Sequence, residues 1–236
     1  MNPLYFGLVM FFAAFTKGLT GFGQALVAVP LLTAVVSVRV TSPLMSLFAL
    51  FSNVYLLIVH RKALNWPEVW RLSLASLVGT PLGVWGLSAL DERVVLGLLG
   101  IVLVSYSLYC LLGPKLPQIR NVNLAFPFGF VAGVLSGAYN TGGPPAVIYG
   151  NGRNWEPAEF KGNLQAFFMI NSLMVCPSHL LHGNYTEEVL RLFLVALPFM
   201  IAGMLVGSRM DRYLDPARFR KVVLVVLVGL GLSLIF

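Results

Sequence analysis

The chain has 236 residues, of which 58% are hydrophobic and only 11% are charged, against roughly 25% charged residues in ordinary soluble domains. A soluble core of this size cannot hide so many apolar side chains, and long stretches without a charge recur throughout. The net charge of +7 comes from Lys and Arg scattered through short connections, which the positive-inside rule explains without a nucleic-acid partner. We therefore expect an all-α polytopic protein of the lipid bilayer.

The apolar residues fall into about eight segments separated by short connections. These are residues 3–36, 42–59, 70–89, 94–112, 124–150, 160–181, 189–208 and 219–236. A continuous helix over the first segment would be ~51 Å long, whereas the hydrocarbon core of a bilayer is ~30 Å thick. The first segment must therefore be broken.

The break in the first segment is predicted at residues 17–24, where three glycines lie close together. Glycine at this density weakens a helix and permits left-handed backbone angles. We expect one half-helix to end near Lys17 with Gly18 as its left-handed cap, and the next to begin near Gln24.

The fifth segment has a similar break at residues 136–145. Here Gly137 is expected to cap the first half-helix, and Asn140 or Thr141 to cap the start of the next. Pro144 and Pro145 then fall in the first helical turn, where proline is tolerated.

The two breaks align with each other at an offset of 119 residues, which places Gly18 on Gly137 and Gly23 on Gly142. Weaker matches follow in the same order, among them Gly83 with Gly203 at an offset of 120. We therefore predict two structural repeats, residues 1–112 and 124–236, joined by a linker at 113–123.

The distribution of cations decides how the broken segments enter the membrane. If both are re-entrant hairpins, one side has twelve Lys and Arg (Arg61, Lys62, Arg71, Lys115, Arg120, Arg153, Lys161 and the five from Arg209 to Lys221) and the other only three (Arg39, Arg93 and Arg191). If both broken segments instead cross the membrane once, the loops on one side have nine Lys and Arg and those on the other side have six. The first ratio is normal for a membrane protein.

Each repeat then consists of a broken hairpin and three transmembrane helices, and the odd number of crossings inverts the second repeat relative to the first. The long basic loops are predicted to face the cytoplasm and both termini the outside. Inverted repeats with discontinuous helices are typical of secondary transporters, which bind substrate at the midplane. The alternative is two long helices kinked by Gly and Pro for packing alone.

Two half-helix N-termini directed inward favour a small anion, because each carries a partial positive charge and free N–H donors. No acidic residue lies inside an apolar segment, which also favours an anionic substrate. The candidate substrate-binding residues are Lys17, Gly21, Phe22, Gly23, Gln24, Tyr139, Asn140, Thr141, Gly142 and Gly143. Lys17 can be interpreted in two ways. It is either a counter-ion for the substrate or a cation that offsets the C-terminal dipole of its own half-helix.

Asn53 and Asn171 occupy matching places in the two repeats, at an offset of 118. They are candidates to line the substrate cavity, and the competing interpretation is that they form hydrogen bonds between helices.

Catalytic and metal-binding patterns are missing from the sequence. Cys110 and Cys176 lie in apolar segments without CxxC or Cys/His spacing, so we expect no disulfide, metal site or cofactor. The chain has no GxSxG or HExxH motif and no intramembrane aspartate pair, so a membrane-embedded enzyme is disfavoured. A channel-like anion facilitator remains the alternative to a carrier.

The residues around the two breaks resemble those of the TauE/SafE sulfite exporter family of bacterial inner-membrane transporters. The resemblance rests on residues 18–23 running into 27–32, on Ser136-Gly137 followed by residues 141–145, and on the two-repeat plan. It implies a multi-pass protein of the bacterial inner membrane that exports sulfite, organosulfonates or related small anions, driven by the proton motive force. Gln24 and Ala25 stand where family members often have further glycines.

Overall fold

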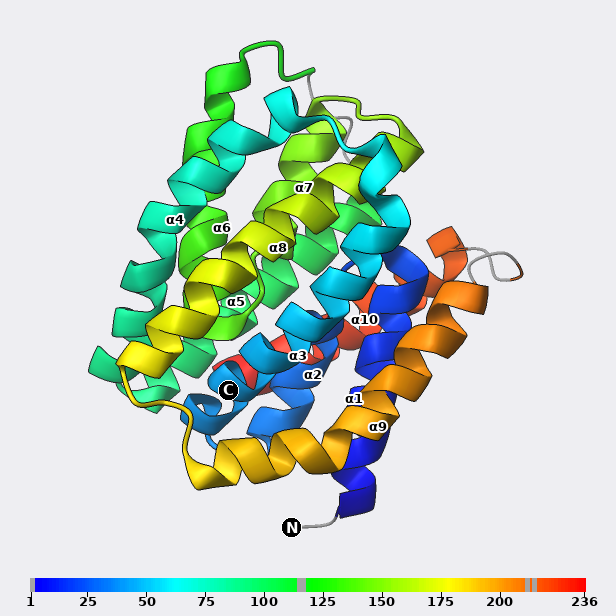
Figure 1. The fold of residues 1–236 in the computed structure, drawn as a ribbon. Coiled ribbons are helices and arrows are strands. Elements are labelled where there is room, and N and C mark those ends of the chain that lie inside the picture. Colours follow the sequence, from blue (N-terminus) through cyan, green and yellow to red (C-terminus); the bar gives the residue numbers. More distant parts are fainter. Residues whose placement is uncertain (1–2, 114–117, 211–212, 214–215) are drawn as a thin grey trace. The chain divides into compact units, whose positions relative to one another are not determined.

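The computed structural model describes residues 3–113, 118–210, 213 and 216–236, and within them it contains helices and no strand (Figure 1). The helices are α1 (Pro3–Thr20), α2 (Gln24–Thr33), α3 (Val38–His60), η1 (Arg61–Ala63), α4 (Trp66–Ala89), α5 (Glu92–Leu112), η2 (Val122–Leu124), α6 (Ala125–Tyr139), α7 (Gly143–Gly152), α8 (Pro157–Leu181), α9 (Glu187–Met210) and α10 (Pro216–Ile235). The prediction of an all-α protein is confirmed.

Six helical stretches of the described residues are long and apolar enough to cross a membrane. They are Val38–Ala63, Trp66–Ala89, Glu92–Leu112, Val122–Tyr139, Pro157–Leu181 and Glu187–Met210. Five of the six spans predicted from the sequence fall inside these stretches. The sixth, 219–236, corresponds to α10, which is not among them and whose first two turns carry Arg218, Arg220 and Lys221. Conversely, Val122–Tyr139 was predicted as part of a hairpin.

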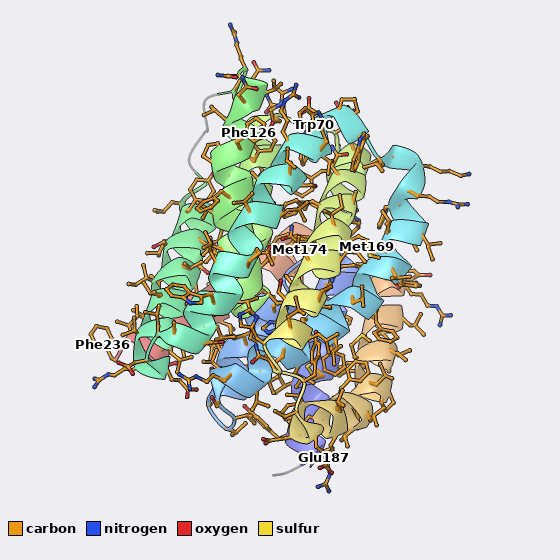
Figure 2. All side chains as sticks on the ribbon, turned by 60° about the vertical axis from the view of Figure 1, so that its left-hand side comes forward. Trp70, Phe126, Met169, Met174, Glu187 and Phe236 are labelled. Atoms are coloured by element: carbon orange, nitrogen blue, oxygen red, sulfur yellow. The ribbon has the colours of Figure 1, made fainter. Side chains whose placement is uncertain are left out.

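The outward faces of the helices are apolar, as Figure 2 shows for side chains along the whole length of the ribbon. On α4, Leu74, Val78, Leu82 and Trp85 follow one another at helical spacing and are all exposed, Val78 by 62%. A soluble monomer rarely exposes so continuous an apolar stripe. A lipid environment accounts for it without a further partner.

The chain divides into two compact units. The first contains α1, α2, the start of α3 up to Leu44, α5, α9 and α10. The second contains α3 from Met45, then η1, α4, η2, α6, α7 and α8. Each unit therefore combines helices from both halves of the sequence, so neither coincides with a predicted repeat.

In the first unit, α1 and α2 fold back on each other as a hairpin. The hydroxyl of Tyr5, near the start of α1, donates a hydrogen bond of 2.8 Å to the carbonyl of Leu31, near the end of α2. The outer side of α1 packs against α9, where Gly203 and Gly207 allow the two backbones to touch. A Cβ atom at Gly203 would collide with the carbonyl oxygen of Phe11. Because the start of α1 is hydrogen-bonded to the end of α2, one long kinked helix is excluded for the apolar segment 3–36.

In the second unit, α6 and α7 form the corresponding hairpin. The rings of Phe128, at the start of α6, and Tyr149, near the end of α7, lie 5.8 Å apart. The outer side of α6 packs against α4, and a Cβ atom at Gly79 would collide with the carbonyl oxygen of Phe130. Small residues that permit such close approach are the usual means of helix association in membranes.

The helix contacts inside the two units correspond residue by residue. Gly203 approaches Phe11 in the first unit as Gly79 approaches Phe130 in the second, and Gly207 approaches Phe15 as Gly83 approaches Val134. The offset is 119 between α1 and α6 and 124 between α4 and α9. These contacts pair Gly203 with Gly79, whereas the sequence comparison paired it with Gly83. The two repeats stay a prediction.

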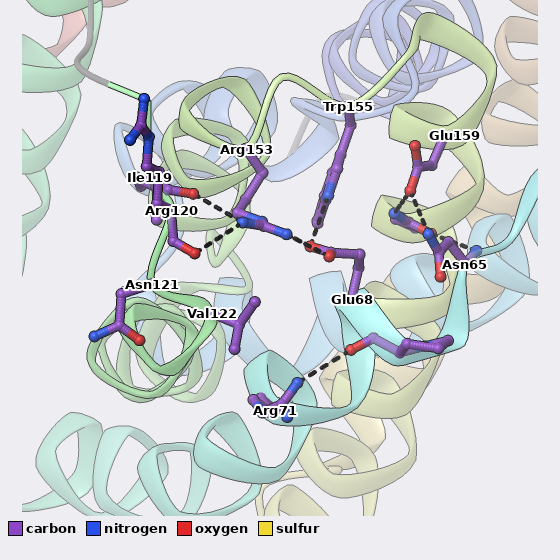
Figure 3. Close-up of polar contacts among 12 residues, drawn as sticks. Asn65, Glu68, Arg71, Ile119, Arg120, Asn121, Val122, Arg153, Trp155 and Glu159 are labelled. Atoms are coloured by element: carbon purple, nitrogen blue, oxygen red, sulfur yellow. Dashed lines mark hydrogen bonds and ion pairs between the residues drawn. The ribbon is translucent and has the colours of Figure 1, made fainter.

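A polar network closes one end of the second unit (Figure 3). Arg153, at the end of α7, donates to both carboxylate oxygens of Glu68 in the first turn of α4, at 2.9 and 2.6 Å. The same guanidinium donates to the carbonyl of Ile119 at 2.8 Å, and the Trp155 indole donates to Glu68 at 3.2 Å. The bond to Glu68 raises the pKa of Arg153. The network thus fixes the end of the second hairpin to α4 and to the linker.

Candidate functional site

The first helix break consists of the three residues between α1 and α2. Gly21 and Gly23 have φ angles of +84° and +91°, which are left-handed values that favour glycine. The N–H of Gly21 bonds to the carbonyl of Lys17 at 2.8 Å and closes the last turn of α1. The hydroxyl of Thr20 lies 2.8 Å from the Phe22 carbonyl and holds the turn together. α2 then begins at Gln24, as the sequence predicted.

The second break lies between α6 and α7. Asn140 has a φ angle of +57° and ends α6, with its N–H bonded to the carbonyl of Ser136 at 2.8 Å. The N–H of Thr141 bonds to the carbonyl of Leu135 at 3.2 Å. α7 begins at Gly143, with Pro144 and Pro145 in its first turn as predicted. Because these prolines lack N–H groups, the start of α7 offers fewer backbone donors than an ordinary helix.

The predicted helix caps are wrong in both breaks. α1 continues through Gly18 to Thr20, and α6 continues through Gly137 to Tyr139. Both glycines instead allow close packing, because a Cβ atom would meet the Met204 carbonyl at Gly18 and the Thr80 carbonyl at Gly137. Neither Asn140 nor Thr141 caps α7, whose N-cap is Gly142 without a side-chain bond.

Gly142 is present for packing and not for an unusual backbone conformation. Its φ angle is −67°, which any residue can adopt. A Cβ atom here would collide with the Ser136 hydroxyl and lie 2.6 Å from the Ala132 carbonyl oxygen. A side chain at this position would therefore disturb the contact between α6 and α7.

The predicted substrate-binding residues fall into two local groups, one in each unit. Residues 17 and 21–24 surround the first break, and residues 139–143 form the second. Most of the side chains are buried, including Phe22, Gln24 and Tyr139. Lys17 lies in the last turn of α1 and is only 5% exposed, and both readings of this lysine stay predictions.

Asn53 and Asn171 both form hydrogen bonds between helices of the second unit. The Asn53 amide donates to the Ser172 hydroxyl at 2.8 Å, which connects α3 with α8. The Asn171 amide donates to the Ser76 hydroxyl at 3.2 Å, and its carbonyl accepts from Thr80 at 3.2 Å, which connects α8 with α4. These bonds match the interpretation of interhelical hydrogen bonding.

The sequence did not single out Arg220, which lines a cavity beside the first break together with Phe22 and Gly23. The charge count placed this arginine in a connecting loop, whereas the structure places it in the second turn of α10. A signal was available, because Arg220 falls inside the predicted apolar segment 219–236.

Comparison with known proteins agrees with this architecture. Residues 6–234 match the family model described as sulfite exporter TauE/SafE. The chain is 25% identical over 221 residues to the probable sulfite/organosulfonate exporter TauE of Cupriavidus necator, covering 91% of this chain and 86% of the relative. It is 24% identical over 175 residues to the probable inner membrane transporter protein TsaS of Comamonas testosteroni, covering 73% of each. No solved structure matches. The chain belongs to the TauE/SafE family of membrane transporters and is not an enzyme.

Proposed function

We propose that this chain is a secondary transporter that exports a small anion, such as sulfite or an organosulfonate, across the bacterial inner membrane. The names of the two relatives support the substrate class and the location. The described acidic residues add to this, because they lie in connections and terminal turns and leave the helix interiors without a fixed negative charge. We further propose that each helix break, within its own unit, holds residues that bind the anion.

The observation that carries this proposal is an unsatisfied donor at the second break. Thr141 is 2% exposed, yet its hydroxyl has no hydrogen-bond partner among the described residues. The amide nitrogen of the neighbouring Asn140 also lacks one. An unpaired buried polar group costs about 1–3 kcal/mol, so it is retained where a ligand or water satisfies it. At the start of α7, the helix dipole favours an anion as that ligand.

Transport by the purified protein tests the proposal directly. In liposomes loaded with sulfite, we expect saturable efflux and accelerated exchange when sulfite is also present on the other side. A channel-like facilitator would give flux that does not saturate. Absence of any sulfite or sulfonate flux from folded protein would refute the proposed substrate class.

Thr141→Val tests the binding residue, because valine keeps the shape of threonine and removes its hydroxyl. We expect at least a tenfold loss of sulfite transport at low sulfite concentration, since a charge-assisted hydrogen bond is lost. Thr41→Val is the matched control, because Thr41 in α3 is equally buried and its hydroxyl also has no partner among the described residues. Equal transport by both variants would remove Thr141 from the site.

The direction of insertion follows from the distribution of cations and is part of the proposal. We expect the linker from Lys115 to Arg120 in the cytoplasm and both termini outside. A reporter that fluoresces only in the cytoplasm should stay dark when fused after Phe236 and fluoresce when inserted in the linker. Fluorescence from the C-terminal fusion would contradict the two re-entrant hairpins.

A further inference from the structure

A cavity opens beside the first helix break, entirely within the first unit. The enclosed space is small, about 20 Å³, and it widens to about 310 Å³ when the open solvent in front of it is included. Its lining includes Thr20 of α1, Phe22 and Gly23 of the break, Tyr106 of α5, and Arg220 and Leu224 of α10. Three separate stretches of the chain, residues 16–26, Tyr106 and residues 220–227, therefore meet around one space next to the start of α2.

The charged residue among those that line this cavity is Arg220. Its Nη2 donates to the hydroxyl of Tyr106 and to the thiol sulfur of Cys110, both at 3.3 Å. These acceptors are neutral, and no carboxylate of the described residues forms an ion pair with Arg220. Its Nε is buried and has no hydrogen-bond partner among the described residues. Within that part of the chain, the guanidinium therefore contacts neutral groups and has one donor without an acceptor.

The surroundings of Arg220 favour an anion over other ligands. A guanidinium away from bulk water is stabilised most by an oxyanion, which supplies both the opposite charge and acceptors for its planar donors. The guanidinium carbon lies 5.4 Å from the centre of the Phe22 ring, so the aromatic residue of the break helps to place it. The start of α2 adds the partial positive charge of a helix N-terminus.

Gly23 leaves the backbone beside the cavity accessible. A Cβ atom at this residue would have one atom within 4 Å, the Thr16 methyl group at 3.5 Å, so crowding by neighbouring backbone is not the reason for glycine at this position. The reason is the left-handed φ angle of +91°, which favours glycine. Lys17, the cation among the candidate residues from the sequence, is not part of the cavity lining.

We propose that Arg220 is the counter-ion of the transported anion, and that a sulfite or sulfonate group binds to its guanidinium on the open side of this cavity. The inference rests on the proposed function and names a charged residue beside the first helix break. Thr20, Phe22 and Gly23 shape the cavity. Tyr106 orients the guanidinium by accepting a hydrogen bond at its hydroxyl.

The test compares Arg220→Gln with Arg218→Gln, which removes the same charge from an exposed position two residues earlier in α10. The measurement is the rise in melting temperature of purified protein as sulfite is added, since a ligand of the folded state raises it with concentration. Arg220→Gln is expected to need at least tenfold more sulfite than wild type for the same rise, and Arg218→Gln the same amount as wild type. Chloride at equal ionic strength controls for screening.

Val223→Phe provides a second variant that keeps the arginine and places a larger side chain in the cavity lining. It is expected to weaken sulfite binding at least threefold. If Arg220→Gln does not accumulate as folded protein, this variant still tests whether sulfite binds at the cavity. Unchanged sulfite affinity in folded Arg220→Gln, or in Val223→Phe, would overturn the proposal. So would loss of the sulfite response in Lys17→Ala but not in Arg220→Gln.

Failure of this inference differs from failure of the proposed function. If wild-type protein transports sulfite and Arg220→Gln does so with unchanged affinity, only the assignment of Arg220 is wrong. If wild-type protein neither binds nor transports sulfite or a sulfonate, the proposed function itself is wrong.

Discussion

Gly83→Ala and Gly203→Ala are each expected to destabilise the protein strongly, although each adds only one methyl group. At Gly83 the new Cβ atom would collide with the Val134 carbonyl oxygen of α6, and at Gly203 with the Phe11 carbonyl oxygen of α1. Backbone atoms of a packed helix cannot turn away as a flexible side chain can, so the helices must separate. Overpacking of this kind costs about 1–3 kcal/mol, which lowers the melting temperature of a chain of this size by roughly 2–12 °C.

Gly86→Ala is the matched control for this prediction. Gly86 lies on the same helix as Gly83, and a Cβ atom there would meet nothing within 4 Å. Alanine is the better helix former by up to about 1 kcal/mol, so this variant is expected to melt at the wild-type temperature or slightly above it. Thermal unfolding in detergent, followed by intrinsic fluorescence, measures all three variants. Equal melting temperatures for Gly83→Ala and Gly86→Ala would contradict the packing of α4 on α6.

Glu68→Gln is expected to produce the second large effect, by weakening the network at the end of the second unit. The carboxylate of Glu68 accepts three hydrogen bonds, two from Arg153 and one from Trp155. Both members of the ion pair are largely buried, with side chains 19% and 17% exposed for Arg153 and Glu68. Removing one partner leaves the arginine without its counter-charge. We expect a loss of about 1–3 kcal/mol in the free energy of unfolding.

A double-mutant cycle separates the ion pair from other effects of these substitutions. Arg153→Gln in the Glu68→Gln background is expected to add little further loss, because the interaction is already gone. Glu159→Gln is the control at the same end of the unit, where Glu159 accepts a single strong bond from the exposed Asn65. It is expected to change stability by less than about 0.5 kcal/mol. Strictly additive losses for Glu68 and Arg153 would show that the pair does not stabilise the protein.

The helix breaks were visible in the sequence because their causes are local. Two glycines within three residues, Gly21 and Gly23, interrupt the first apolar segment where the structure has left-handed backbone. The pair Pro144 and Pro145 marks the first turn of α7 in the same way. Proline and glycine act on their own backbone angles, so their effect is the same whatever surrounds them.

The functions of individual glycines could not be predicted in this way. Gly18 and Gly137 look like helix caps in the sequence, yet both lie within helices and allow close contact with a distant helix. Glycine satisfies either need equally well, so its presence alone does not tell a turn from a close contact. The same ambiguity led to the alignment of Gly203 with Gly83 in the sequence comparison. The helix contacts of Gly203 correspond instead to those of Gly79.

By itself, the sequence determined that this protein is a helical membrane protein, where its helices run and where two of them break, because hydropathy and backbone propensity act over a few turns. The tertiary structure alone decided that α1 packs against α9 and α4 against α6, and that Arg220 of α10 meets Phe22 of the first break. Lipid and a neighbouring helix are equally apolar, so hydropathy cannot distinguish a face that meets one from a face that meets the other. That choice depends on the fit between surfaces far apart in the sequence.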